Sequence, residues 1–110
     1  MYQDKIVLCG ASAYEKKFYL NEDFSSLPQQ VKDELKIACV LYTAEVGGVI
    51  TLEFDQDGHL NIVASSKEND LLFDEIGSAL KIKDMQIKKQ ELWETLELYY
   101  KVFFLGEDME

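Results

Sequence analysis

Apolar and polar residues alternate most regularly between residues 49 and 64. Every second position is apolar, on both sides of a short polar break at 55–59. A period of two is typical of strands with one buried face, and two such strands joined by a short turn form a hairpin. The apolar positions are Ile50, Leu52, Phe54, Leu60, Ile62 and Ala64.

The polar break fixes how the two strands pair. Its candidate turn residues are Asp55, Asp57, Gly58 and His59. A type I turn with Gly58 in the left-handed conformation places Asp55 opposite His59 and Phe54 opposite Leu60. A slip of one residue would bury Glu53 or Asn61, so the pattern predicts a single register.

A helical period replaces this alternation between residues 26 and 48. Ser26 is a candidate N-cap with Pro28 in the first turn, and Gly47 and Gly48 end the segment. Beyond Ile37 the segment is apolar nearly all round, which predicts that more than one side is covered. The expected buried stripe consists of Val31, Leu35, Ala38, Cys39 and Tyr42.

Two shorter apolar stretches precede that helix. Residues 5–10 (KIVLCG) and 16–21 (KKFYLN) read as strands that pair as a hairpin. The loop between them, around ASAYEK, does not match a tight turn.

Residues 70–105 carry helical periodicity, with Asn69 or Asp70 as the cap. The stretch from Lys81 to Glu91 is mostly polar, so either one long helix or two helices meeting near Lys83 fit the pattern. One expected buried stripe consists of Leu72, Ile76 and Leu80, and a second of Met85, Leu92, Leu96, Tyr99 and Phe103.

The resulting order is β-β-α-β-β-α, with the last region counted as one helix or two. It predicts an α+β fold of two layers, in which an antiparallel sheet of about four strands, made from two hairpins, has helices on one face. Residues 1–106 are expected to form a single domain, followed by an acidic C-terminal tail at 107–110.

The charge of the chain disfavours some classes of binding partner. The formal net charge is −10, and all 11 basic residues are lysines. An acidic surface without arginine disfavours binding to nucleic acid and to membrane surfaces. The one basic cluster, Lys81, Lys83, Lys88 and Lys89, reads as a solvated helix face, with a small anion site as the alternative. Since residues 1–13 lack a signal-peptide core, the expected location is the cytoplasm.

Candidate chemistry is sparse. A calcium loop starting at Glu53 would need an acidic ligand at position twelve, which is Ala64. The single histidine, His59, lies on the outward side of its strand, whereas Cys9 and Cys39 lie in apolar stretches typical of buried thiols. The sequence therefore predicts no metal, no cofactor and no catalytic residue, and it favours a non-enzymatic protein.

The C-terminal helix has the densest group of large apolar side chains. Plain core packing accounts for such a group, but a domain of 110 residues has limited core to cover two faces of this helix. The sequence therefore predicts a protein-interaction module that forms a homodimer through this helix, with an apolar small-molecule pocket between sheet and helices as the alternative. The residues concerned are Trp93, Leu96, Tyr99, Tyr100, Phe103 and Phe104.

Two long segments, KIVLCGASAYEKKFYLNEDFSSLPQQVKDELKIACVLYTAEVGG and LLFDEIGSALKI…YYKVFFLG, carry a family resemblance over nearly the full length. The chain resembles a family of small uncharacterised proteins from clostridial-type Firmicutes, known only as a domain of unknown function. The resemblance implies a bacterial cytosolic protein and implies no activity.

Overall fold

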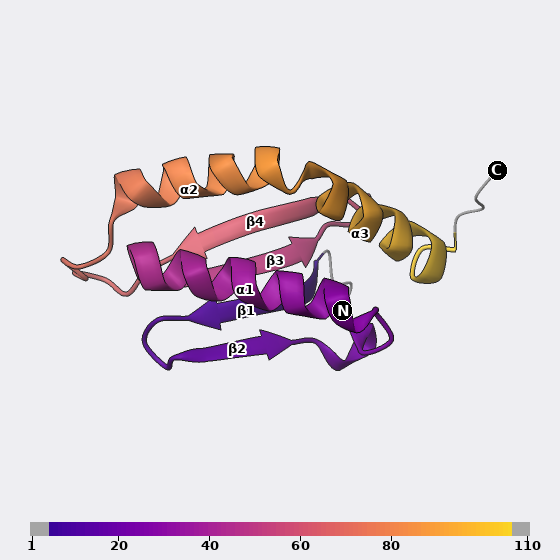
Figure 1. Ribbon diagram of the computed structural model, residues 1–110, viewed down its shortest axis with the longest axis horizontal. Coiled ribbons are helices and arrows are strands. Elements are labelled where there is room, and N and C mark those ends of the chain that lie inside the picture. Colours follow the sequence, from indigo (N-terminus) through magenta and orange to yellow (C-terminus); the bar gives the residue numbers. More distant parts are fainter. Residues whose placement is uncertain (1–4, 107–110) are drawn as a thin grey trace.

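The chain folds into a four-stranded antiparallel sheet with three α-helices, as seen in a computed structural model that describes residues 5–106 (Figure 1). The α+β class and the element order predicted from the sequence are confirmed. The predicted tail at 107–110 lies outside the described residues. The elements are β1 (Ile6–Ser12), β2 (Lys17–Leu20), a 3₁₀ turn η1 (Glu22–Phe24), α1 (Gln29–Val46), β3 (Val49–Phe54), β4 (Leu60–Ser65), α2 (Glu75–Lys88) and α3 (Gln90–Phe103).

The strands lie in the order β2-β1-β3-β4. The β3–β4 hairpin has the predicted register, with Phe54 opposite Leu60, Leu52 opposite Ile62, and Ile50 opposite Ala64. The turn also closes as predicted, because the backbone N–H of Asp55 donates to the carbonyl of His59 over 3.0 Å and Gly58 has a φ of 85°.

The first hairpin is tighter than the sequence suggested. Ser12 pairs with Lys17, so the loop comprises only residues 13–16. β1 then continues as the partner of β3, with a register shift between Val7 and Cys9. This second pairing places β1 inside the sheet and leaves β2 as one of its two edges.

The core forms between the sheet and α1, which crosses over the middle strands (Figure 1). Leu52 and Phe54 of β3 are fully buried, as are Leu35 and Tyr42 of α1. The Tyr42 hydroxyl shares a 2.5 Å hydrogen bond with the Ser78 hydroxyl of α2, which satisfies both buried groups and ties α2 to the flank of α1.

The start of α1 differs from the expectation. The helix begins at Gln29 with Pro28 in the cap position, and Ser26 is not the N-cap. A residue before proline avoids the helical conformation, so Leu27 cannot continue a helix begun at Ser26. The Ser26 hydroxyl instead lies 2.7 Å from the Tyr99 hydroxyl of α3.

The C-terminal region forms two helices, and they meet at Lys89 rather than near Lys83. The cap of α2 is Asp74, whose carboxylate accepts the N–H of Gly77 over 2.8 Å. The predicted cap at Asn69 or Asp70 is wrong, because the Asp70 carboxylate is used elsewhere. It accepts the Leu72 N–H and the Tyr14 hydroxyl, which holds the preceding loop against the first hairpin.

Two glycines in left-handed conformations give a stability test. Gly58→Ala should cost about 1–2 kcal/mol of unfolding free energy, because a β-carbon is disfavoured at positive φ and meets side chains alone, those of Lys101 at 2.8 Å and Leu105 at 3.2 Å. Gly48→Ala should cost at least about 1 kcal/mol more, since its β-carbon would lie 2.5 Å from the backbone oxygen of Ser65. Urea unfolding of both variants measures the difference; equal losses would contradict this packing.

Candidate binding surfaces

Three of the six large side chains predicted to form a contact at the C-terminal helix lie in the core. Trp93, Leu96 and Tyr100 are buried within the chain. The Trp93 indole N–H donates to the backbone oxygen of Met85 over 3.0 Å, so its polar group is satisfied across the α2–α3 junction. These three side chains therefore have almost no free surface to offer a partner.

A stack of aromatic rings accounts for the burial of Tyr100. The Tyr100 ring lies on the Phe54 ring with centroids 4.3 Å apart, and Phe24 lies 5.7 Å from Phe54. Phe104 covers Phe24 at 4.7 Å. Offset rings at such distances attract one another beyond simple burial, so this stack fixes α3 on the end of the sheet.

The rest of the predicted aromatic surface is only partly free. Tyr99 is half-buried, with its hydroxyl held by Ser26. Phe103 is 71% exposed, and Phe104 and Leu105 keep part of their surface open. An open apolar area thus exists at the end of α3, and it is smaller than the set of residues predicted from the sequence.

The largest departure from expectation is on α2. The stripe of Leu72, Ile76 and Leu80 was predicted to be buried, and that prediction is wrong, since these side chains are 92%, 77% and 65% exposed. The helix packs on α1 through its opposite side, where Ser78 and Met85 are buried. The spacing correctly grouped Ile76 and Leu80 on one face, but that face points to solvent, and Leu72 lies in the turn before the helix.

The outward side of α1 is also open. The sheet and α2 cover two sides of the apolar half of α1, as the pattern predicted, but Ile37 and Leu41 remain exposed. They border a hollow of about 220 Å³ between α1 and α2, which Lys81 and Asp84 complete. The exposed apolar residues on these sides of the two helices are Ile37, Leu41, Ile76, Leu80 and Ile87.

Ion pairs absorb most of the predicted basic cluster. Lys81 pairs with Glu45 at 2.8 Å and Lys89 with Glu34 at 3.8 Å, both across the α1–α2 contact. Lys88 pairs with Asp84 on its own helix at 3.4 Å. Because carboxylates of the chain already pair with these lysines, the ion pairs support the interpretation of a solvated helix face over that of an anion site.

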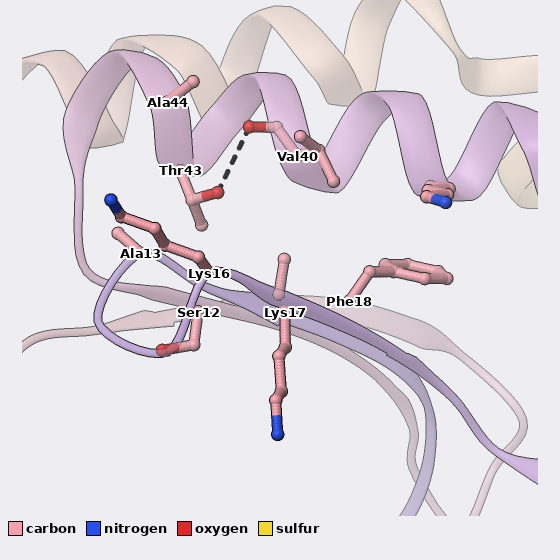
Figure 2. A pocket seen from close by; sticks show the side chains of 10 residues that line it. Ser12, Ala13, Lys16, Lys17, Phe18, Val40, Thr43 and Ala44 are labelled. Carbon is pink, nitrogen blue, oxygen red and sulfur yellow. Dashed lines mark hydrogen bonds between the residues drawn. The ribbon is translucent and has the colours of Figure 1, made fainter.

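A groove opens on the other flank of α1, beside the edge strand β2 (Figure 2). Its volume is about 680 Å³, within the usual range of small-molecule sites. Its walls come from the first hairpin and from one side of α1. They consist of Ala11, Ser12, Ala13, Lys16, Lys17, Phe18, Lys36, Val40, Thr43 and Ala44.

The alternative predicted from the sequence, an apolar pocket between sheet and helices, named residues of the C-terminal helix and none of these, because the groove walls come from segments about 20 residues apart that have no shared motif. The only local signal is the pair of adjacent lysines Lys16 and Lys17, at the end of a short loop and the start of β2. Glu97 was also missed as a contact residue. Its carboxylate accepts the N–H of Leu60 over 2.7 Å and so covers part of the β4 edge.

The hairpin turn at 55–59 holds the carboxylates of Asp55 and Asp57 and the His59 imidazole within 4.8 Å of one another. The Asp55 carboxylate is already occupied, because it accepts the backbone N–H groups of Asp57 at 2.9 Å and His59 at 3.0 Å. Its function is therefore to close the turn, with the exposed His59 imidazole 3.9 Å away.

The two cysteines lie on facing elements in the core, Cys9 on β1 and Cys39 on α1, and both are free and fully buried. The neighbouring Cys39 thiol and burial both raise the pKa of Cys9 far above its usual value. A buried thiol of this kind is a poor nucleophile. His59, exposed on the far hairpin, does not meet either thiol.

Comparisons with known proteins agree with the resemblance seen in the sequence. A family of unknown function, DUF6145, matches residues 5–108. The chain belongs to this family. No curated protein and no solved structure matches the chain. Within residues 5–106 no helix has the length and apolar character needed to cross a membrane.

The pKa of Asp55 gives a pH prediction. Burial alone would raise this pKa, but hydrogen bonds from the backbone of His59 and Asp57 outweigh it, so the pKa lies below its usual value. A carboxyl group with a lowered folded-state pKa stabilises the fold above about pH 4, and this stability is lost as the pH falls through the folded-state pKa. Asp55→Asn should flatten that acid loss in urea unfolding between about pH 2 and 5.

The matched control is Asp57→Asn, which removes the same charge from an exposed side chain in the same turn. Its pH profile should follow that of the unmodified protein. Identical flattening in both variants would show that the turn hydrogen bonds are not the cause.

Proposed function

We propose that this protein is a non-enzymatic interaction module that works as a homodimer, with α2 as the contact. The observation that carries the proposal is the solvent-facing apolar stripe made by Ile76 and Leu80 of α2 and by Leu72 in the turn before the helix. Contiguous exposed apolar rows are uncommon on monomeric proteins and mark interaction sites. Ile76 and Leu80 are spaced by four, so they lie side by side on the helix.

The charges along α2 favour a second copy as the occupant. The helix starts at Asp74 and Glu75 and ends at Lys88 and Lys89. In an antiparallel pair of α2 helices, the acidic end of each lies against the basic end of the other. A two-fold symmetric contact of this kind is self-complementary, as an isologous interface requires.

The proposal thus retains the homodimer predicted from the sequence but moves its contact from the C-terminal helix to α2. Of the six residues predicted for the contact on the C-terminal aromatic helix, only Phe103, Phe104 and the free side of Tyr99 can contribute, because Trp93, Leu96 and Tyr100 are in the core. At α2 the exposed apolar residues Ile76 and Leu80 are combined with complementary helix ends, and the end of α3 has no such pair of charged ends.

The groove beside β2 supports a second candidate function, the binding of a small molecule between sheet and helix. The two functions are compatible because the groove lies between α1 and the first hairpin, whereas the dimer contact is on the outward side of α2. A cytoplasmic location belongs to the same proposal, since free buried thiols such as Cys9 and Cys39 suit a reducing compartment.

Leu80→Glu tests the dimer. Burying one leucine side chain contributes about 1.5–3 kcal/mol, and a symmetric interface contains two, so the dimer Kd should rise at least about 100-fold. Sedimentation velocity over a concentration series measures the Kd. Leu98→Glu is the matched control, an exposed leucine on α3 outside the stripe, and should leave it unchanged. A monomer at all concentrations for the unmodified protein would overturn the proposal.

Charge exchange tests the antiparallel arrangement separately. Glu75→Lys and Lys88→Glu should each weaken the dimer, because each places like charges at both ends of the paired helices. The double variant should recover affinity, since it restores opposite charges. If the double variant is weaker than either single variant, the helices do not pair in this orientation.

A further inference from the structure

We infer that the groove between α1 and the first hairpin binds a small carboxylic acid with an apolar body. The inference rests on the second candidate function and names its ligand class. Three features carry it: the space beside β2, the apolar middle of the groove, and the lysines that surround this middle.

The space exists because small side chains stand where the sheet and α1 diverge. Ala11 and Ala13 come from β1 and the loop after it, and Ala44 from α1 (Figure 2). β2 is an edge strand, so no further strand closes this side. The opposite edge differs, because Glu97 of α3 covers part of β4 through Leu60.

The middle of the groove is apolar. Val40 extends from α1 toward the sheet, and Phe18 extends from β2 beneath the helix (Figure 2). Phe18 is half-buried and Val40 is 40% exposed, so both keep surface that a ligand would remove from water. Covering such surface favours an apolar body at about 25 cal/mol per Å².

The charge of the groove is the reverse of that of the chain. The chain has a formal net charge of −10, yet the charged residues that line the groove are Lys16, Lys17 and Lys36, with no aspartate or glutamate among them. Within the described part of the chain, none of these three lysines forms an ion pair, in contrast to Lys81, Lys88 and Lys89. A carboxylate is the complementary ligand group.

Lys16 is the lysine best placed to meet that carboxylate. Its backbone is left-handed, with a φ of 54°, and its side chain rises toward α1, whereas Lys17 points away (Figure 2). Thr43 lies across the groove from it, with its hydroxyl donating to the Val40 carbonyl over 3.1 Å. Lys36 lies one helical turn before Val40, so it borders the apolar middle of the groove on the α1 side.

Octanoate and octanol serve as matched probes of similar length, one charged and one neutral. Titration of the isotope-labelled full chain, followed by amide NMR shifts, should show octanoate binding with shifts concentrated at Ala13, Phe18 and Ala44. The double variant Lys16→Glu/Lys36→Glu should weaken octanoate about tenfold or more. Lys32→Glu, on α1 but outside the groove lining, should not weaken it.

Ala44→Trp fills the groove from an exposed helix position, so it should abolish binding without unfolding the chain. The outcomes separate the two ideas. If octanol binds the groove as tightly as octanoate, and the lysine variants have no effect, the carboxylate inference is overturned while small-molecule binding stands. If neither probe shifts the groove amides, both are overturned.

Discussion

The apolar row of β3 is the constraint on which the rest of the fold depends. Ile50, Leu52 and Phe54 are fully buried, and each faces a partner on β1 or β4 in the same register. Sliding β4 by one residue would turn the polar Asn61 side chain into the core. Phe54 extends this control to the helices, because its ring stacks on Tyr100 at 4.3 Å and thereby positions α3. The register of one strand thus decides where the last helix lies.

A sheet of four short strands has room for one helix across its middle, and α1 takes that place. α3 packs on the end of the sheet through its aromatic residues, and α2 is left to pack along the flank of α1. Its anchors, the Tyr42–Ser78 hydrogen bond and the Lys81–Glu45 ion pair, are on one side. The opposite side, with Ile76 and Leu80, is then left uncovered by the rest of residues 5–106.

These facts explain which features could be predicted from sequence. Period-two alternation specified the β3–β4 register, and helical spacing specified the buried stripe of α1 around Leu35 and Tyr42, because in both cases the apolar face meets the only available core. The same logic failed for Leu80. Periodicity tells which residues share a face, whereas coverage depends on the tertiary arrangement. The groove was out of reach for the same reason, since it exists only where α1 and the first hairpin diverge.

α1 connects the surfaces that remain open. One side of it, with Leu35 and Tyr42, is in the core; Val40 and Ala44 face the groove; Ile37 and Leu41 face the hollow beside α2. A helix positions its residues around a rigid cylinder, so one buried stripe fixes the two other flanks at once. Core packing alone therefore does not account for the continuous apolar run in the second half of α1. This run supplies one wall to each of two separate surfaces, and substitutions on one flank can alter one surface without entering the other.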